Sequence, residues 1–470
     1  MPDEEICYMP AAELVEAIRA RRLSPVEVTT AVLRRIEQVN PKINAYCTLA
    51  ADAALADARA AESAVMRGGV LGPLHGVPIS FKDLTLTAGI RTTFGSKVFE
   101  HHVPQEDAVV VERARRAGAI VLGKTNTPEF GCNGATENRI FGHTRNPWKL
   151  DRIPGGSSGG AAAALAAGLG PLAEGSDLAG SVRLPAGCCG VVGFKPSLGR
   201  IPLYPSLNGF TGFFVHGSMA RTVGDVSLLF SVMSGPDDRD PQSLPATGED
   251  FARAAEGGIS GLRVAWTADL GYAAVEPEVR RLIEAAAKSI ASLGCVVEEA
   301  HPGFEDPEQL FLDLTAPFRA AACGQYLASF KDQMDPILVK RLQMAEGVTA
   351  VDYEKASHRR TAFWQIVRRF FERYDLLLTP TAAVAPFAVG IDFPTEIAGR
   401  RVQSPLAWLP FTIPFNLTGQ PAISVPCGFT RDGLPVGLQI VGRRFADATV
   451  LRAAAAWEMV APWAHLRPPV

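Results

Sequence analysis

A glycine-rich stretch at residues 155–183 carries two serine sites whose hydroxyl groups could do chemistry. It reads GGSSGGAAAALAAGLGPLAEGSDLAGSVR, with Ser157 and Ser158 near its start and Ser181 near its end. Glycine permits backbone angles closed to other residues and lets a ligand approach the main chain. This concentration of glycine around hydroxyl groups predicts a backbone shaped for catalysis.

One interpretation of the stretch is a nucleophile elbow. Residues 156–160 (GSSGG) match the pattern GxSxG with Ser158 as the nucleophile. An elbow needs an apolar strand directly before it and a histidine farther along the chain. Residues 146–154 (NPWKLDRIP) do not predict such a strand, and no downstream histidine stands out. These features argue against the elbow.

Two other sites could carry different chemistry. Residues 118–125 (GAIVLGKT) match the Walker A pattern, but the positions that would cradle phosphate are apolar and predict a strand instead. The eight cysteines are scattered without a CxxC pair, and Cys188 and Cys189 lie in an apolar setting. We expect buried thiols in a reducing cytoplasm, with a cysteine nucleophile as the minor option.

Lys82 offers a base for a serine nucleophile. It follows residues 77–81 (VPISF), a short apolar run that predicts a buried strand. A lysine acts as a base only when neutral, and its ordinary pKa is about 10.4. Burial can lower that pKa by roughly 3–5, whereas a lysine that extends to the surface would keep its charge. The two serine sites supply both a proton relay and a nucleophile.

The elements around these residues alternate between helices and strands. Residues 10–70 are expected to be helical, with a capping box at 24–27 (SPVE). A helix at 161–168 would direct its N-terminus at the glycine loop. Further strands are expected at residues 119–122, 171–174, 192–194, 262–266, 295–299, 376–378, 422–425 and 436–441. Further helices are expected at 107–117, 223–234, 277–293 and 446–460. Residues 306–373 are expected to be mostly helical. This alternation predicts one large α/β domain with a mixed sheet.

The composition excludes several classes of function. The chain has 470 residues, 47% of them hydrophobic, and a formal charge of -3, which gives no basic field for nucleic acid. It has no apolar run of about 18 residues that would span a membrane, and its N-terminus does not resemble a signal peptide. We therefore expect a cytoplasmic protein that binds neither nucleic acid nor membrane.

Six segments together resemble the amidase signature enzymes, in the order of that family and over nearly the whole chain. They are residues 76–84 (GVPISFKDL), 123–131 (GKTNTPEFG), 146–148 (NPW), 154–168 (PGGSSGGAAAALAAG), 175–197 (GSDLAGSVRLPAGCCGVVGFKPS) and 433–442 (GLPVGLQIVG). The resemblance implies an α/β amidase signature fold, with a central mixed, mostly parallel, twisted sheet flanked by helices.

The resemblance also implies a single amidase domain over residues 1–470. Its expected parts are an N-terminal helical segment at 1–70, a core with the catalytic signature at 72–235, a variable substrate-pocket region at 236–373 and a return to the core sheet at 374–470. No cofactor or metal is implied, and a homodimer is expected at the level of the family.

Carried over residue by residue, the resemblance assigns a catalytic triad. Lys82 matches the catalytic lysine of the family, and Ser157 matches the relay serine that follows a cis peptide bond. Ser181 matches the nucleophile. The implied reaction is acyl transfer, in which Ser181 attacks a carbonyl carbon while its proton passes through Ser157 to Lys82.

The same resemblance places an oxyanion hole beside the nucleophile. Its donors would be the backbone N–H groups of Leu178, Ala179, Gly180 and Ser181. The loop would be supported by Ser158 and by an ion pair between Asp177 and Arg183. The remaining lysines of these segments, Lys124 and Lys195, are expected to be structural.

The sequence departs from the common pattern of the family at Ala179. Many members have DTGGS where residues 177–181 read DLAGS, so alanine replaces a glycine of the oxyanion loop. Alanine tolerates positive φ poorly. The local angles of the loop, and its room for substrate, are therefore open at this point.

The resemblance implies a hydrolase that cleaves carboxylic amide C–N bonds. Small apolar or aryl amides are expected, with carbamates or esters as further substrates. The region 306–345 suggests this through Phe311, Leu314, Phe318 and Tyr326, although these side chains can equally belong to the core. The expected substrate-binding residues are Phe130, Gly131, Cys132 and Phe318.

Two other functions stay open. One is the amidotransferase component that forms the glutaminase part of a tRNA-amidating complex. The absence of a basic surface for RNA and the altered oxyanion loop argue against it. The other is an inactive relative that serves as a binding module, and the presence of Lys82, Ser157 and Ser181 argues against that function.

Overall fold

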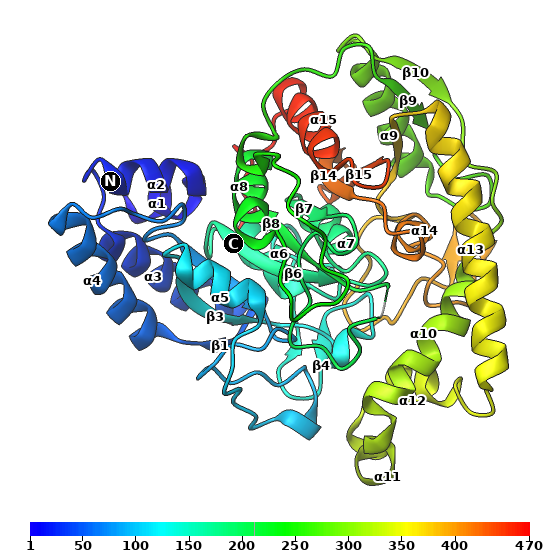
Figure 1. The fold of residues 1–470 in the computed structure, drawn as a ribbon, viewed down its shortest axis with the longest axis horizontal. Coiled ribbons are helices and arrows are strands. Elements are labelled where there is room, and N and C mark those ends of the chain that lie inside the picture. Colours follow the sequence, from blue (N-terminus) through cyan, green and yellow to red (C-terminus); the bar gives the residue numbers. More distant parts are fainter. Residues whose placement is uncertain (211) are drawn as a thin grey trace.

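One sheet of eleven strands crosses the whole molecule (Figure 1). The computed structural model describes residues 1–210 and 212–470. In spatial order the strands are β1 (Tyr46–Leu49), β3 (Ile120–Thr125), β2 (Pro78–Lys82), β6 (Leu172–Asp177), β8 (Val215–Ala220), β7 (Val192–Lys195), β14 (Ala422–Phe429), β15 (Pro435–Gly442), β11 (Leu376–Pro380), β9 (Arg263–Trp266) and β10 (Val296–Glu299). Short hairpins outside it are β4 (Glu137–Asn138) with β5 (Gly142–His143), and β12 (Glu396–Ile397) with β13 (Arg400–Arg401).

The strands run in both directions, which confirms the expected mixed sheet. The balance differs from the expectation of a mostly parallel sheet, because six of the ten neighbouring pairs are antiparallel. Parallel pairing joins β3 to β2 to β6 and β11 to β9 to β10. An apolar strand looks the same in either direction, so the pattern of single strands could not predict this balance.

Helices cover both faces of the sheet, as the α/β class requires. Successive residues of a strand point to opposite faces. On β7, a side chain at Gly193 would meet Ala186 of α7 (Arg183–Cys189), whereas Phe194 packs on Phe230 of α8 (Val223–Met233) with ring centroids 5.0 Å apart. Helix α6 (Gly159–Ala166) contacts α7, and α15 (Asp447–Val460) contacts α8. The sheet is therefore the middle of three layers.

Helix α6 is buried along its whole length. Its sequence, GGAAAALA, contains almost only small side chains. A side chain at Gly160 would clash with the backbone of Asn126, so this helix needs glycine at the point of closest approach. Small residues thus let the N-terminal end of α6, and the serine loop before it, lie in the interior of the protein.

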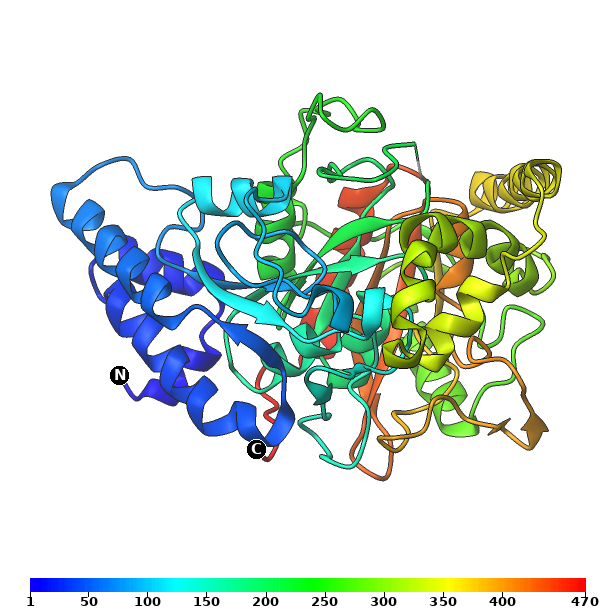
Figure 2. The same cartoon turned by 90° about the horizontal axis from the view of Figure 1, so that it is seen from below.

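The N-terminal helices gather at one end of the sheet, on the left in Figures 1 and 2. The predicted capping box is present, because Ser24 Oγ accepts from Glu27 N and the Glu27 side chain accepts from Ser24 N. The helices of this group are α1 (Asp3–Tyr8), α2 (Ala11–Arg19), α3 (Pro25–Ile43) and α4 (Ala51–Arg67).

A mostly helical segment lies at the opposite end, on the right in Figures 1 and 2, and it falls within residues 306–373, which were expected to be mostly helical. It contains α10 (Glu308–Cys323), α11 (Leu327–Phe330), α12 (Pro336–Gln343) and α13 (Ala350–Arg373). The remaining helices are α5 (Val109–Arg116), α9 (Pro277–Ala291) and α14 (Ile413–Leu417). None of the helices in the described ranges is both long and apolar enough to cross a membrane.

Candidate active site

Lys82 is the last residue of β2, and its side chain is fully buried. The strand pairs with β3 on one side and with β6 on the other. Lys82 Nζ donates to Ser157 Oγ at 2.7 Å, to Ser176 Oγ at 3.1 Å and to Ser176 O at 3.3 Å. The strand pairing therefore fixes this amino group against the serine loop before α6 and against the end of β6.

Burial lowers the pKa of Lys82 to about 7. The charges of Glu174 and Asp177 act in the opposite direction, and the charge of Arg319 lowers the pKa further. An ordinary lysine is almost entirely protonated at neutral pH, whereas a large share of Lys82 is neutral there. Lys82 is therefore able to accept a proton.

Ser157 and Ser158 have different surroundings, although they are neighbours. Ser157 follows a cis peptide bond and faces Lys82. The Ser158 hydroxyl is fully buried and exchanges long hydrogen bonds of 3.4 Å with Ser176 N and O. The Ser158 N–H donates to Ser181 O at 3.0 Å. Ser158 thus ties the two serine loops together, and the elbow interpretation with Ser158 as nucleophile finds no support.

Ser181 lies just before α7 and lines a pocket, where it is partly exposed. Gly131 lines the same pocket, and a side chain at that position would contact Ser157 Oγ. Gly131 therefore lies between this pocket and the Ser157 hydroxyl. Within residues 1–210 and 212–470, no hydrogen-bond partner occupies Ser181 Oγ, which leaves this oxygen available to a ligand.

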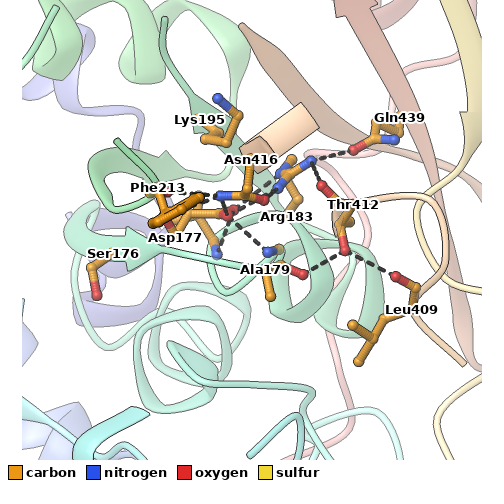
Figure 3. Close-up of polar contacts among 12 residues, drawn as sticks. Ser176, Asp177, Ala179, Arg183, Lys195, Phe213, Leu409, Thr412, Asn416 and Gln439 are labelled. Carbon is orange, nitrogen blue, oxygen red and sulfur yellow. Dashed lines mark hydrogen bonds and ion pairs between the residues drawn. The ribbon is translucent and has the colours of Figure 1, made fainter. Parts of the chain in front are cut away.

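Asp177 and Arg183 form a buried ion pair behind the loop that carries Ser181 (Figure 3). Arg183 Nε and Nη2 donate to the two carboxylate oxygens at 3.0 and 2.9 Å. The same carboxylate accepts the N–H groups of Gly180 at 2.7 Å and Val182 at 3.2 Å. Burial raises the pKa of Asp177, but the charge and hydrogen bonds of Arg183, the charge of Lys195 and the hydrogen bond from Asn416 together outweigh it and leave the pKa below its ordinary value. The expected supporting ion pair is present.

Three residues from the last part of the chain complete this network (Figure 3). Arg183 donates to Gln439 Oε1 at 2.7 Å and to Asn416 Oδ1 at 2.5 Å. Thr412 Oγ1 donates to Ala179 O at 2.6 Å. Sequence reasoning missed all three, because more than 200 residues separate them from the loop and no local pattern marks them.

The backbone angles of the loop resolve the question raised by Ala179. Gly180, and not Ala179, has the positive φ of the loop, at 113°. A side chain at Gly180 would also clash with Thr412. Ala179 therefore occupies a position that tolerates alanine, and the glycine that the loop requires is present at Gly180.

The four backbone N–H groups expected in the oxyanion hole are not equivalent. The Gly180 N–H already donates to Asp177 Oδ1. For Leu178, Ala179 and Ser181, the described part of the chain offers no acceptor to the backbone N–H. The expectation is therefore corrected at Gly180, whose hydrogen bond stabilises the loop itself.

The pocket around Ser181 contains only part of the expected lining. Gly131 and Cys132 line it, together with Asn133, Leu178, Ala179, Phe311, Arg319, Arg341, Leu406 and Leu409. Phe130 does not: its ring lies parallel to that of Tyr326, with an angle of 3° between the planes. Phe318 packs against the hydrophobic core instead of lining the pocket. Helical pattern alone could not tell which face of 306–345 meets the site.

Two arginines at this pocket were not anticipated. Arg341 of α12 is only 9% exposed, and among the described residues it has neither an ion-pair partner nor a hydrogen-bond acceptor. Arg319 of α10 makes one long hydrogen bond, to Phe130 O at 3.4 Å. Nothing in the sequence distinguishes these two from the other basic residues. Together they give the pocket a positive charge.

Comparison with known proteins identifies both the family and the fold of the chain. Residues 27–451 match the family model Amidase. The chain belongs to the amidase signature family. An acylamidase from Rhodococcus erythropolis is 42% identical over 473 residues, which cover 100% of this chain and 98% of that protein.

Two further relatives are similar to this amidase over nearly its whole length. A glutamyl-tRNA(Gln) amidotransferase subunit from Moorella thermoacetica is 38% identical, over 99% of each chain. A bacterial aryl acylamidase of the amidase signature family, known from its crystal structure, superposes with a TM-score of 0.93 at 33% identity, over 97% of each chain. The protein is therefore an enzyme that hydrolyses amides.

Two other lysines of the amidase are buried as deeply as Lys82. Burial lowers the pKa of Lys124 to about 8 and that of Lys195 to about 7. Lys124 donates to Thr87 Oγ1 at 2.7 Å and to a backbone oxygen, and Lys195 donates to Pro196 O at 2.9 Å. A lowered pKa is thus not particular to the site. What distinguishes Lys82 is its contact with Ser157.

The cysteines of the amidase offer no better nucleophile. Cys188 and Cys189 lie inside α7, and burial raises the pKa of Cys188 to about 12. A thiol acts as a nucleophile in its thiolate form, which such burial disfavours. Cys132 lines the pocket but makes no contact with the lysine.

Proposed function

We propose that this amidase cleaves the C–N bond of small amides through an acyl-enzyme, with Lys82 as base, Ser157 as relay and Ser181 as nucleophile. The observation that carries the proposal is the 2.7 Å hydrogen bond from Lys82 Nζ to Ser157 Oγ at a fully buried lysine. Its support is that Lys82 holds a neutral form at neutral pH, while Ser181 Oγ lies free in the adjacent pocket.

In the proposed first half-reaction, neutral Lys82 takes the proton of Ser157, and Ser157 takes the proton of Ser181. The freed electron pair of Ser181 Oγ forms a bond to the carbonyl carbon. The carbonyl π electrons move to oxygen and produce a tetrahedral oxyanion. When the oxyanion collapses, the C–N bond breaks, and the proton held by Lys82 returns through Ser157 to the leaving nitrogen.

In the second half-reaction, water replaces Ser181 on the acyl carbon. Lys82 and Ser157 take a proton from the water, the water oxygen bonds to the carbonyl carbon, and the second tetrahedral intermediate releases Ser181 with that proton. The backbone N–H groups of Leu178, Ala179 and Ser181 are the donors we propose for both oxyanions. Removing one such donor typically costs about 2.7–4 kcal/mol in activation free energy.

The pocket supports acyl or amine groups with apolar, including aryl, character. Phe311, Leu406 and Leu409 provide apolar surface, and the relatives from Rhodococcus erythropolis and from the crystal structure are named as acylamidases. The guanidinium groups of Arg319 and Arg341 add a second preference. We propose that amides with a carboxylate near the scissile bond bind better than their neutral counterparts, because a guanidinium pairs with a carboxylate through two parallel hydrogen bonds.

Carbamates and esters are proposed as further substrates of the same site. Both present a carbonyl carbon to Ser181 and develop the same oxyanion. They differ in the leaving group, since an ester releases an oxygen that needs less protonation than an amine. An ester should therefore depend less on the relay through Ser157 than an amide does.

The alternative function is the glutaminase part of a tRNA-amidating complex. It is favoured by the 38% identity to the Moorella thermoacetica amidotransferase chain over nearly the whole length. The higher identity to an acylamidase, 42%, favours the hydrolase that acts alone. Hydrolysis of an aryl acetamide by the purified chain, with no activity on glutamine, would decide for the hydrolase, and the reverse pattern would decide for the glutaminase.

A fluorophosphonate probe tests the catalytic assignment directly. We expect the adduct on Ser181 by peptide mass mapping, no label in Ser181→Ala and much slower labelling in Lys82→Ala. Ser158→Ala serves as the matched control because Ser158 lies beside the relay without contacting Lys82. An adduct on Ser158, or full-rate labelling of Lys82→Ala, would refute the proposed roles.

A further inference from the structure

A buried carboxylate lies directly behind Lys82, on the neighbouring strand. Glu174 of β6 is fully buried and accepts two hydrogen bonds at Oε2. One comes from the Lys82 backbone N–H at 3.2 Å, and the other from Thr85 Oγ1 at 2.9 Å. Thr85 N also donates to Lys82 O at 2.9 Å. Glu174 therefore braces the turn that follows Lys82.

The second oxygen of this carboxylate is held by the next strand. His216 of β8 places Nδ1 2.7 Å from Glu174 Oε1, and its side chain is only 6% exposed. An ionised carboxylate only accepts hydrogen bonds, so the shared proton lies on Nδ1. Burial raises the pKa of Glu174, but the hydrogen bond and charge of His216, the hydrogen bond from Thr85 and the charge of Lys124 together outweigh it and leave the pKa lowered. Glu174 is therefore an anion at neutral pH.

Glu174 does not form an ion pair with Lys82 Nζ. That nitrogen contacts only neutral oxygens, on Ser157 and Ser176. No carboxylate of the described residues lies within ion-pair distance of it. A direct ion pair would hold Lys82 as an ammonium and remove the base. A carboxylate bound to the Lys82 backbone instead acts on the amine from a distance.

Other charged groups surround this arrangement. The charges that shift the pKa of Lys82 or of Glu174 belong to Asp177 on β6, Lys124 on β3, His216 on β8 and Arg319 on α10. Lys82 is thus enclosed by charges of both signs, of which Glu174 contributes the largest stabilisation of its ammonium form.

We propose that Glu174, held in its ionised form by His216 and Thr85, is a positioning residue that sets the pH range in which Lys82 serves as the base. This inference rests on the proposed function of Lys82 and goes beyond it. Without the anion, Lys82 would lose its proton at lower pH and become a weaker base. If the anion instead contacted Nζ directly, Lys82 would remain an ammonium and could not act as a base.

The experiment measures kcat/KM and the fluorophosphonate labelling rate of Ser181 across pH. Glu174→Gln keeps the shape and removes the charge. We expect the acidic limb of both profiles to move to lower pH by roughly one pH unit, the lower end of what a nearby charge typically causes. An unmoved limb with a uniformly lower plateau would show that Glu174 only braces the fold, and a limb moved to higher pH would overturn the inference.

Two further variants keep the test decisive if Glu174→Gln does not fold. Thr85→Val and His216→Leu each remove one hydrogen bond to the carboxylate and favour its protonation, so both should move the limb in the same direction. Ser218→Ala is the matched control: Ser218 pairs with Glu174 across β6 and β8, and its hydroxyl has no partner among the described residues. The acidic limb of the Ser218→Ala pH profile should lie at the same pH as that of the parent enzyme.

The same measurements separate this inference from the proposed function. If Lys82→Met labels as fast as the parent enzyme, Lys82 is not the base and the proposed function fails. If Lys82→Met is slow but neither Glu174→Gln, Thr85→Val nor His216→Leu moves the limb, the proposed function stands and only the role of Glu174 is refuted.

Discussion

Thr412 Oγ1 donates a hydrogen bond of 2.6 Å to the carbonyl oxygen of Ala179, across 233 positions of the sequence. At the other end of the same peptide unit, the Gly180 N–H donates to the Asp177 carboxylate. One peptide unit of the oxyanion loop is thus held at both ends by side chains. The free N–H groups on either side take their direction from this fixed unit.

Loss of the Thr412 hydroxyl should therefore impair catalysis more than binding. In Thr412→Val the Ala179 carbonyl loses its partner, and we expect kcat to fall about fivefold while KM changes little, since a net hydrogen bond is worth about 1 kcal/mol. Steady-state kinetics on an aryl acetamide measures the effect. Thr418→Val is the control, because the Thr418 hydroxyl bonds to Pro414 O away from the loop. Equal losses in both variants would contradict the prediction.

The two small residues of the loop should respond in opposite ways to substitution. Gly180 has a φ of 113° and no room for a side chain beside Thr412, so Gly180→Ala should abolish activity. Ala179 has no positive φ, so Ala179→Gly should keep most of the activity. Fluorophosphonate labelling of Ser181 compares the two directly. Retained labelling of Gly180→Ala would show that the loop adapts to the extra carbon.

The activity of the parent enzyme should rise with pH through about 7, the pKa of Lys82. Below this pH the side chain is an ammonium and accepts no proton, and above it the amine is free. We expect the rise in kcat/KM for an amide, with a shallower dependence for an ester of the same acyl group. A profile that is flat between pH 5.5 and 8.5, within about twofold, would argue against Lys82 as the base.

The same lysine should make stability depend on pH. Its pKa is about 7 in the folded protein and about 10.4 in the unfolded chain, so the unfolded chain binds more protons between these values. The contribution of Lys82 to the free energy of unfolding therefore increases as pH rises through this window. Lys82→Met should be more stable than the parent enzyme near pH 7, with a gap that narrows toward pH 10. Denaturant titrations at both pH values test this, and a constant gap would refute it.

Breaking the Asp177–Arg183 pair should cost more than breaking an exposed pair. Both side chains are fully buried, so Arg183→Met leaves an uncompensated anion and should lower the free energy of unfolding by about 3–5 kcal/mol. Arg253 pairs with Glu256 at the surface, where the side chains are 70% and 61% exposed, so Arg253→Met should change little. Denaturant unfolding compares them. Similar effects in both variants would mean that the buried network is not required for stability.

Arg341 should select among substrates. In Arg341→Leu we expect KM for an amide with a carboxylate on its acyl group to rise at least tenfold, while KM for the neutral analogue stays within about threefold. Lys340→Leu is the control, because Lys340 is the exposed neighbour on α12. If the two substrates respond equally to Arg341→Leu, the arginine has no role in recognising the anionic group.

Local patterns in the sequence predicted the elements that carry Lys82 and Ser157, two residues of the proposed triad. Lys82 ends a strand because residues 77–81 form a short apolar run, and the small residues of 161–168 predicted the buried helix α6. The strand β8 was not predicted, since it lies in a segment rich in glycine and proline, yet both its edges are paired at the centre of the sheet. His216 was missed with it, because its role depends entirely on which strands become neighbours.

The supporting residues around Ser181 escaped prediction for a related reason. Asn416 of α14 and Gln439 of β15 are polar side chains that only become buried when elements distant in sequence come together. A single sequence records that such residues are present, but the acceptor or donor that each one meets is set by the tertiary fold. The apolar run before Lys82 left both a buried base and a surface lysine open, and the resemblance to the amidase signature enzymes decided for the base.

The position of Thr412, Asn416 and Gln439 in the last part of the chain also concerns the order in which the enzyme is made. A ribosome releases Ser157, Ser181 and Lys82 long before it releases the residues that hold the oxyanion loop. During synthesis the reactive groups are therefore present without the scaffold that orients them. We therefore expect the nascent chain to become active only after Thr412, Asn416 and Gln439 have reached the loop that carries Ser181.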